Sequence, residues 1–390
     1  MKSIRDLENL NNQIVLLRLD LNVPILDGKI IDTNRIDKII PTINFLLSKN
    51  AKIIIISHVG RPKGKFKSEL SLQPIRDNLS SHVNENVKLE KTNIFNLKKD
   101  ELFKSADEKL IILENIRFYP QEESNNEEFS ENLAKLGDIY VNDAFSCSHR
   151  DHASVTSITK FIPSYSGLQI KSEVEALKKI TTEIKKPITC IIGGSKISTK
   201  IDIIKNLIPK FDNFIIVGAM ANNIFKYKGH NIGASLFEKN SEKITEGIFS
   251  EIKKNNCKIY IPEDVKVGKN LEDDSVQKTL KEIENDDMIL DAGPKTIQRI
   301  KNVIDNSSTI LWNGPLGYFE NPNFSTGSLE IAKYIGNKEG EIYSVIGGGD
   351  TVSVINSIKI KNKFNFVSTA GGAFLEYLEG KILPGIRALD

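Results

Sequence analysis

The chain has 390 residues, of which 39% are hydrophobic and 27% are charged, and its formal net charge is +2. This composition is typical of a soluble globular protein of about two or three domains, and so small a net charge gives no general basis for binding nucleic acid or membranes. Because its apolar runs are shorter than the roughly 18 residues of a membrane span and its start lacks a signal-peptide core, we expect a cytoplasmic protein.

Short β-branched runs alternate with amphipathic segments along the whole chain. Predicted strands of the first half lie at residues 13–20, 51–58, 109–115 and 138–143. Those of the second half lie at 188–194, 214–218, 258–262, 288–293, 309–314, 342–349 and 364–369. Continuous apolar runs indicate strands that are buried on both faces, and their alternation with helices predicts βαβ units in parallel sheets.

Residues 166–187 are predicted to form one long helix between two α/β domains. Ile170, Val174, Leu177 and Ile180 recur at helical spacing, and Pro187 ends the run. The three cysteines, at positions 147, 190 and 257, are widely spaced and form no C-x-x-C, which argues against a disulfide framework or a structural zinc.

Polar residues follow the predicted strands of the first half, at the strand ends where ligands bind in open α/β sheets. They are mostly cationic: Arg18, Asp20, Asn22, Arg35, His58, Arg61, Arg117, His149, Arg150 and His152. Arginine grips phosphate or carboxylate with a planar fork of donors, so these residues predict a pocket for a small, multiply anionic substrate. Taken singly, each arginine could equally be a surface ion pair. The H-x-x-H of His149 and His152 leaves a metal site open beside anion binding or packing.

Glycine loops follow the strands of the second half. GGSK (193–196) follows a strand and opens a predicted helix, so backbone N–H groups could face an anion there, although the spacing is not that of a Walker loop. Lys196 and Lys200 are predicted to share one face of this helix. In GGGDT (347–351), Asp350 could reach a metal ion on nucleotide phosphates, and Thr351 could cap the helix or bind phosphate. With WNGPLGYFE at 312–320, these loops predict a nucleotide site, and the two halves together predict phosphoryl transfer between two ligands.

The chain resembles the phosphoglycerate kinases over essentially its whole length. The matching stretches, in the family's order, are LLRLDLNVP, SHVGRP, LENIRF, VNDAFSCSHRDHAS, IIGGSKISTKI, LWNGPLGYFE, VIGGGDT and STAGGAFLEYLEGKILPG. The resemblance implies a monomer that transfers a phosphoryl group reversibly between 1,3-bisphosphoglycerate and ADP, giving 3-phosphoglycerate and ATP, with Mg²⁺ carried by the nucleotide.

The fold that the resemblance implies is α/β, with two doubly wound parallel-sheet (Rossmann-like) domains joined by a long helix. Residues 1–168 and the returning C-terminal tail 381–390 would form a phosphoglycerate-binding domain. Residues 169–380 would form a nucleotide-binding domain, with a linker helix at about 169–185. The acceptor carboxylate is already ionised at pH 7, so transfer needs no general base. It would rest on positioning, charge neutralisation and domain closure that excludes water.

The resemblance also implies a role for individual residues. The phosphoglycerate would be bound by Asp20, Leu21, Asn22, Arg35, His58, Val59, Gly60, Arg61, Arg117 and Arg150. The nucleotide would be bound by Gly193, Gly194, Lys200, Glu320, Gly348, Gly349, Asp350 and Thr351, with Asp350 at the metal. Arg35, Lys196 and Lys200 would act on the transferred phosphoryl group.

Four positions depart from the family's pattern. Val217, Ala219 and Ala370 stand where glycines are common, and a Cβ costs on the order of 1 kcal/mol wherever φ must be positive. Such a Cβ could also narrow the purine pocket, and Asp151 adds a negative charge beside Arg150. Two rival hypotheses are another carboxylate or carbamate kinase and a relative that binds nucleotide without turnover. The presence of Arg35, Lys200 and Asp350 favours the active enzyme.

Overall fold

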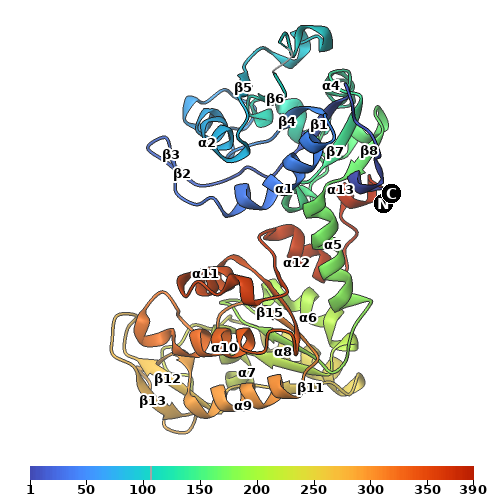
Figure 1. The fold of residues 1–390 in the computed structure, drawn as a ribbon. Coiled ribbons are helices and arrows are strands. Elements are labelled where there is room, and N and C mark those ends of the chain that lie inside the picture. The colour runs from blue at the N-terminus through green and yellow to red at the C-terminus, as the bar shows by residue number, and fades with distance from the viewer. Residues whose placement is uncertain (106–107) are drawn as a thin grey trace. The chain divides into compact units, whose positions relative to one another are not determined.

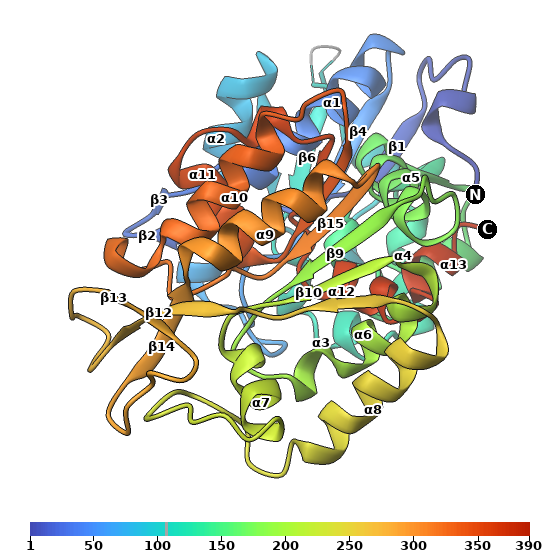
Figure 2. The same ribbon diagram turned by 90° about the horizontal axis from the view of Figure 1, so that it is seen from below.

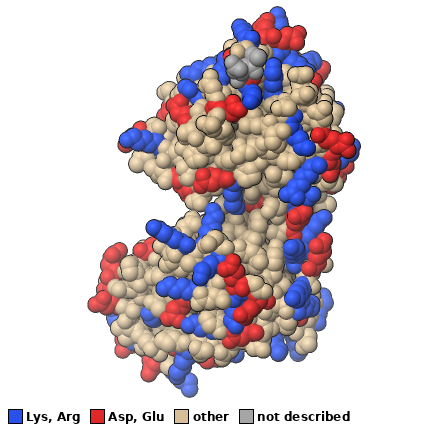
Figure 3. Space-filling view, viewed as in Figure 1, with Lys and Arg blue, Asp and Glu red and all other residues tan. Residues whose placement is uncertain are grey.

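A computed structural model describes residues 1–105 and 108–390, which divide into two compact units. Unit 1 comprises Met1–Val174 and Ile382–Asp390, and unit 2 comprises Glu175–Lys381 (Figure 1). Within the described residues, no helix is both long enough and apolar enough to cross a bilayer. On the face of the molecule in Figure 3, lysine and arginine side chains are interspersed with aspartate and glutamate over both units.

Unit 1 is built on a parallel sheet with the strand order β5-β6-β4-β1-β7-β8. The inner strands β6 (Leu110–Leu113), β4 (Lys52–Ile56), β1 (Ile14–Arg18) and β7 (Ile139–Asn142) are the predicted ones, and they are almost completely buried. The edge strands β5 (Val87–Glu90) and β8 (Ser164–Ser166) were not predicted, because a half-exposed edge strand needs no continuous apolar run. A short hairpin of β2 (Ile25–Leu26) and β3 (Lys29–Ile30) lies outside the sheet.

Helices cover both faces of this sheet, as the predicted doubly wound fold requires. Alternate residues of β1 point to opposite faces, so Val15 and Leu17 join one core and Leu16 joins the other. The first core includes apolar residues of α1 (Asn34–Ser48) and α2 (Gln73–Val83). The second includes residues of α4 (Glu127–Ala134), which follows the single turn of α3 (Pro120–Glu123). The tail returns to this unit through α13 (Pro384–Arg387), where the Gly385 N–H donates to the Ser148 carbonyl at 2.8 Å.

Unit 2 has a second parallel sheet, with the strand order β11-β10-β9-β15-β16-β17. Its strands are all predicted ones: β9 (Ile188–Ile192), β10 (Asn213–Ile216), β11 (Lys258–Tyr260), β15 (Thr309–Asn313), β16 (Tyr343–Gly347) and β17 (Phe366–Val367). Figure 2 shows α9 (Pro294–Asp305) and α10 (Thr326–Gly336) on one face of the sheet, and α6 (Ile201–Leu207), α7 (Ala219–Tyr227) and α8 (Glu242–Lys254) on the other. The remaining helices of unit 2 are α11 (Gly349–Ser357) and α12 (Gly372–Leu378).

The strand predicted at 288–293 exists, but its placement in a parallel sheet was wrong. β14 (Met288–Ala292) pairs antiparallel with β12 (Asp264–Gly268), which pairs antiparallel with β13 (Val276–Thr279). Polar residues alternate with Val265 and Val267 in β12, so that strand has no apolar run to reveal it. An apolar run reports burial, and it does not distinguish a parallel neighbour from an antiparallel one.

The long helix α5 (Leu168–Thr181) passes from unit 1 into unit 2, and it ends earlier than the predicted end near residue 185. The hydroxyl groups of Thr181 and Thr182 turn back onto the carbonyls of Leu177 and Lys178, at 2.8 and 3.2 Å. Such back-bonding competes with helix propagation, and a residue that precedes proline disfavours the helical region. The periodic pattern of 166–187 therefore overstated the length of the helix.

The start of α5 rests on Asp143, which follows β7 and is buried. Its carboxylate accepts from the Ile170 N–H at 3.0 Å and from the Thr42 hydroxyl at 2.5 Å, and burial raises the pKa of Asp143 to about 6. Between pH 3.8 and about 6, the folded state therefore keeps a proton on Asp143 that the unfolded state, with a pKa near 3.8, has released. This contribution to stability is complete below the unfolded pKa and is lost as the pH rises through about 6.

We expect Asp143→Asn to remove this pH dependence. The stability difference between the wild type and Asp143→Asn should therefore be more favourable to the wild type at pH 5 than at pH 7.5, by about 1 kcal/mol. Urea unfolding of both proteins, followed by circular dichroism at the two pH values, measures this difference. A difference that stays constant with pH would show that the Asp143 carboxyl does not titrate in this range.

Candidate active site

The strand ends of unit 1 bring several predicted substrate residues into one hydrogen-bonded cluster. Asp20 follows β1, and its carboxylate binds the Arg35 guanidinium of α1 at 2.8 Å. Asn22 accepts from the Gly60 N–H at 2.9 Å, and the Gly60 carbonyl accepts from Arg117 at 3.0 Å. Residues that follow three different strands are thus held together by direct contacts. Gly60 has φ of +63°, a conformation that favours glycine.

Leu21 and Val59 have buried side chains, so only their main chains are available to a ligand. Arg61 and Arg150 are exposed, and within the described chain neither makes a hydrogen bond or ion pair with the cluster. Arg150 nevertheless lies close enough to His152 to help lower the pKa of that imidazole. Burial is the main cause of this shift, which takes the pKa of His152 to about 4.

The contacts of His152 and Asp151 bear on the alternatives left open for this region. His152 lies 3.8 Å from the buried Glu122, and the possible metal ligands around His149 and His152 do not form a group of three among the residues described. The Asp151 carboxylate accepts from Asn125 at 2.9 Å and from Thr156 at 2.5 Å. It therefore ties its own loop to the turn between α3 and α4.

Several side chains that support this cluster were given no ligand role by the resemblance. Ser146 donates to the Asp20 carboxylate at 2.5 Å, and Asn115 donates to the Val59 carbonyl at 2.8 Å. Arg18, the last residue of β1, is completely buried and contacts His58. Only Arg18 gave a sequence signal, as a cation at a strand end.

In unit 2 the two central strands, β9 and β15, are neighbours in the sheet. The chain leads from β9 to β10 on one side of this pair and from β15 to β16 on the other. Glycines at both strand ends let the following loops touch. A Cβ on Gly193 would lie 2.2 Å from the Pro315 carbonyl oxygen, and one on Gly314 would lie 2.2 Å from the Gly193 oxygen. A reversal of strand order of this kind is where ligands bind in open α/β sheets. The glycines of GGSK and WNGP thus build the crevice through close backbone contact.

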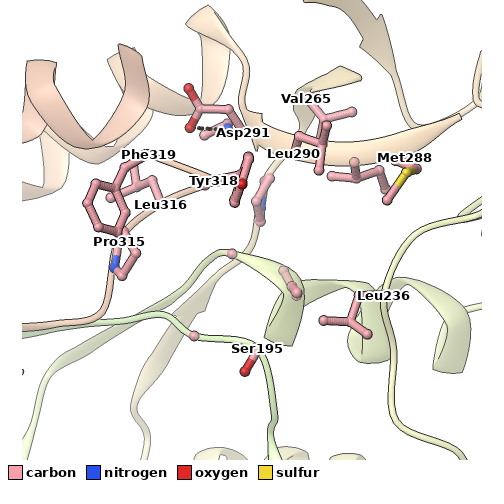
Figure 4. A pocket seen from close by; sticks show the side chains of 18 of the residues that line it. Ser195, Leu236, Val265, Met288, Leu290, Asp291, Pro315, Leu316, Tyr318 and Phe319 are labelled. Atoms are coloured by element: carbon pink, nitrogen blue, oxygen red, sulfur yellow. Dashed lines mark hydrogen bonds between the residues drawn. The ribbon is translucent and has the colours of Figure 1, made fainter. Parts of the chain in front are cut away.

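A cavity of about 530 Å³ opens beside these loops. Figure 4 shows Ser195 on one side of it. Around it lie the mainly apolar side chains of Leu236, Val265, Met288, Leu290, Pro315, Leu316, Tyr318 and Phe319. Its polar lining includes Ser195, Asp291, Glu320 and Asp350. An apolar pocket of this size with few polar groups suits a flat organic ligand such as a nucleobase.

Asp291 lies at this cavity, but both of its carboxylate oxygens are already used. They accept from the N–H groups of Ala292 and Gly327 at 2.8 Å, which fixes β14 against the first turn of α10. Burial raises the pKa of Asp291 to about 7. Its role here is to hold the cavity wall.

Three loops meet at Lys200 and Thr351. Lys200 donates to the Asn313 side chain, whose amide in turn donates to the Gly347 carbonyl at 2.8 Å. The buried Thr351 hydroxyl accepts from the Gly314 N–H at 2.7 Å. The loops that follow β9, β15 and β16 are therefore linked by side chains, and burial lowers the pKa of Lys200.

Two parts of the prediction for the glycine loops were wrong: the helical face shared by Lys196 and Lys200, and the helix cap offered as one role of Thr351. The helix after GGSK begins only with the 3-10 turn Ser198–Lys200, so exposed Lys196 lies before it and does not share a helical face with Lys200. The Ser198 N–H is moreover occupied by the Glu238 carboxylate at 2.8 Å, so it does not face a free anion site. Thr351 supports Gly314, whereas α11 begins without a side-chain cap.

The three positions where the family favours glycine carry no backbone strain. Val217, Ala219 and Ala370 are absent from the residues with positive φ in the described chain, whereas Gly218 has φ of +65°. Ala219 lines the cavity, so its Cβ adds to the apolar wall. The expected cost of about 1 kcal/mol at a positive φ therefore does not apply to them.

The family model and the sequence relatives that match this chain carry the same name. The family model described as phosphoglycerate kinase matches residues 4–381. A protein of Wolbachia pipientis wMel named phosphoglycerate kinase is 44% identical over 395 residues, which cover 100% of this chain and 99% of that protein. Another of that name, from Caulobacter vibrioides, is 41% identical over 389 residues and covers 99% and 98% of the two chains.

Solved structures agree with the sequence relatives. The structure of phosphoglycerate kinase from Coxiella burnetii is 36% identical, covers 98% of this chain and 97% of that one, and superposes with a TM-score of 0.90. That of phosphoglycerate kinase from Pyrococcus horikoshii is 28% identical, covers 100% and 98%, and has a TM-score of 0.83. With its matched length, its relatives and its fold all in agreement, the chain belongs to the phosphoglycerate kinase family.

Proposed function

We propose that the chain catalyses reversible phosphoryl transfer between 1,3-bisphosphoglycerate and ADP, which gives 3-phosphoglycerate and ATP in glycolysis. The observation that carries the proposal is the pairing, in one member of this family, of a cationic cluster in unit 1 with a glycine-walled cavity in unit 2. The cationic cluster suits the anionic phosphoglycerate, and the cavity suits the nucleotide.

The cluster of unit 1 suits 3-phosphoglycerate group by group. Arg35, Arg61, Arg117, Arg150 and His58 can donate to its phosphate and carboxylate. The Asp20 carboxylate can only accept, and the substrate's one donor is its hydroxyl group. Asn22, with the main chain of Leu21, Val59 and Gly60, completes the proposed site.

The cavity of unit 2 suits a nucleotide. Its apolar walls would take the base, with Glu320 and Gly194 in the lining and Gly193 packed against the Pro315 main chain. The phosphates would lie toward Lys196, Lys200 and the start of α11, where Gly348, Gly349 and Thr351 place backbone N–H groups and the positive end of the helix dipole.

Asp350 fits the metal that the nucleotide carries. It is exposed in the first turn of α11, and within the described chain its carboxylate makes no hydrogen bond or ion pair, so its oxygens are available to a hard cation. Mg²⁺ bound there with the phosphates would neutralise part of their charge.

The chemistry needs no general base. In the ATP-consuming direction, a carboxylate oxygen of 3-phosphoglycerate bonds to the γ-phosphorus while the bond from phosphorus to the β–γ bridging oxygen breaks, leaving ADP. Charge spreads over the migrating phosphoryl oxygens, and Arg35, Lys196 and Lys200 are the proposed groups that stabilise it. We further propose that the enzyme works in the cytoplasm, which the free cysteines favour, and as a monomer, which the resemblance implies.

The first test is ATP-dependent turnover of 3-phosphoglycerate, coupled to a dehydrogenase that oxidises NADH. We expect turnover that chelation of Mg²⁺ abolishes and added Mg²⁺ restores, and no turnover with acetate or carbamate. Turnover of those acceptors alone would favour the other carboxylate kinases. A protein that binds Mg·ATP but never turns over would be a binding-only relative, and the proposal would fail.

A further inference from the structure

Arg18 is a fully buried cation, and each nitrogen of its guanidinium group contacts a different partner. Its side chain is 0% exposed, and removing a charge from water costs several kcal/mol unless partners compensate. Its Nε donates to the Ser154 hydroxyl at 3.0 Å, and that hydroxyl donates to the buried Glu122 carboxylate at 2.7 Å. Glu122 therefore supplies the compensating charge through Ser154.

The other donors of Arg18 act on the substrate cluster. One Nη1 hydrogen bond, at 2.5 Å, goes to the Leu19 carbonyl, which is the peptide group that leads into Asp20. Nη2 lies 3.2 Å from Nδ1 of His58. One buried guanidinium thus holds both the segment of Asp20 and the ring of His58.

The chemistry of arginine decides the roles in the contact with His58. A guanidinium has donors only and does not lose its proton in proteins, so Nδ1 must be the acceptor and cannot carry a proton. In a neutral ring the proton then resides on Nε2. Within the described residues no hydrogen bond engages Nε2, so it remains available as a donor.

A charged ring is disfavoured at His58 by burial and by the cations around it. The nearby titratable groups are cationic or can become so: Arg18 from β1, Arg117 from the turn after β6, His152 from the loop after β7, and Arg35 from α1. Burial and then these cations lower the pKa of His58 well below its usual value. These effects favour the neutral ring around neutral pH.

We propose that Arg18 is a positioning residue that fixes His58 as the neutral Nε2–H tautomer, so that the ring donates a hydrogen bond to the phosphate of phosphoglycerate. The inference rests on the proposed function for its ligand. Its consequence is that the charge of this subsite comes from arginines alone and does not change around neutral pH.

Nuclear magnetic resonance of the ligand-free protein tests the tautomer without any turnover. The chain has only five histidines, so long-range ¹H–¹⁵N spectra of histidine-labelled protein are tractable, and His58→Gln assigns the signal of His58 by its loss. We expect a neutral Nε2–H ring with one unchanged pattern from pH 6 to 8. A protonated ring, or a proton on Nδ1, would overturn the inference.

A matched pair of variants tests the direction of the hydrogen bond. The amide nitrogen of His58→Gln can replace the Nε2 donor, whereas the amide of His58→Asn reaches only the position of Nδ1. Calorimetry with 3-phosphoglycerate should show Gln within a few-fold of the wild type and Asn weaker by roughly tenfold or more. Equal losses in both, or a tighter Asn variant, would contradict the proposal.

Arg18→Lys provides the third arm. It keeps the buried charge, but an ammonium group cannot span Ser154, Leu19 and His58 as the planar fork does. We expect His58 of a folded Arg18→Lys protein to populate both tautomers, while an unchanged spectrum would show that Arg18 does not fix the ring. If this variant fails to fold, the spectrum of the wild type and the Gln and Asn pair still decide. If the wild type shows the Nε2–H signal but no turnover of 3-phosphoglycerate, the proposed function fails and the inference about the tautomer stands.

Discussion

Arg35→Ala and Lys200→Ala should each lower kcat by at least a hundredfold, which corresponds to about 2.7 kcal/mol of transition-state stabilisation. Arg35 lies in unit 1, where only the Asp20 carboxylate holds it among the described residues, and Lys200 lies in unit 2 against Asn313. Both cations are proposed to face the migrating phosphoryl group, and an alanine cannot replace their charge. The coupled turnover assay measures both losses.

Matched controls separate catalysis from general effects. Arg5→Ala removes an exposed arginine of unit 1, and Lys205→Ala removes an exposed lysine one turn beyond Lys200, so both should keep kcat within a few-fold of the wild type. Circular dichroism should show that all four variants are folded. If Arg35→Ala or Lys200→Ala loses less than tenfold, its assigned role is wrong.

The double variant tests whether the two cations act on one transition state. Residues that act as a unit give losses that do not multiply, whereas independent residues give losses that do. We expect Arg35→Ala with Lys200→Ala to lose clearly less than the product of the two single losses. Full multiplication would show that one of them serves binding or folding elsewhere.

Gly193→Ala should disrupt the nucleotide site by a steric route. The new Cβ would lie 2.2 Å from the Pro315 carbonyl oxygen, which is backbone and cannot swing aside as a side chain can. The loops after β9 and β15 must then separate, which we expect to destabilise unit 2 by about 1–3 kcal/mol and to weaken ADP binding at least tenfold. Thermal unfolding and calorimetry with ADP measure the two effects.

The chain carries its own probe of this change. Its single tryptophan, Trp312, is buried and donates from its indole N–H to the Gly314 carbonyl at 2.7 Å. Separation of the loops should therefore shift its fluorescence. Gly247→Ala is the control, because its Cβ meets nothing within 4 Å in the middle of α8, and alanine there should stabilise by about 0.5–1 kcal/mol. Wild-type fluorescence and ADP affinity in Gly193→Ala would refute the close-packing argument.

The sequence by itself determined the fold class, and it pointed to the kinds of site that are proposed. All eleven predicted strands exist, and ten of them lie in the two parallel sheets, because strands buried on both faces require continuous apolar runs. The motifs at their ends supplied the candidate residues of both proposed sites, because the carboxyl ends of parallel strands are fixed by chain direction, and the resemblance supplied the role proposed for each. Six strands are missing from the prediction: β2, β3, β5, β8, β12 and β13. All but β12 are partly exposed, and the buried β12 alternates polar with apolar residues, so none of them has a continuous apolar run.

Only the tertiary structure decided what each polar residue does. Arg18 gave the same local signal as the exposed Arg61, yet it is buried against His58 and Ser154, which are 40 and 136 residues away in sequence. The helix start after GGSK was expected to turn its N–H groups toward an anion, but the Glu238 carboxylate binds the Ser198 N–H there. Local patterns report burial and periodicity over a few residues. The partner of a polar group is set by how distant segments meet, and that depends on the packing of the whole unit.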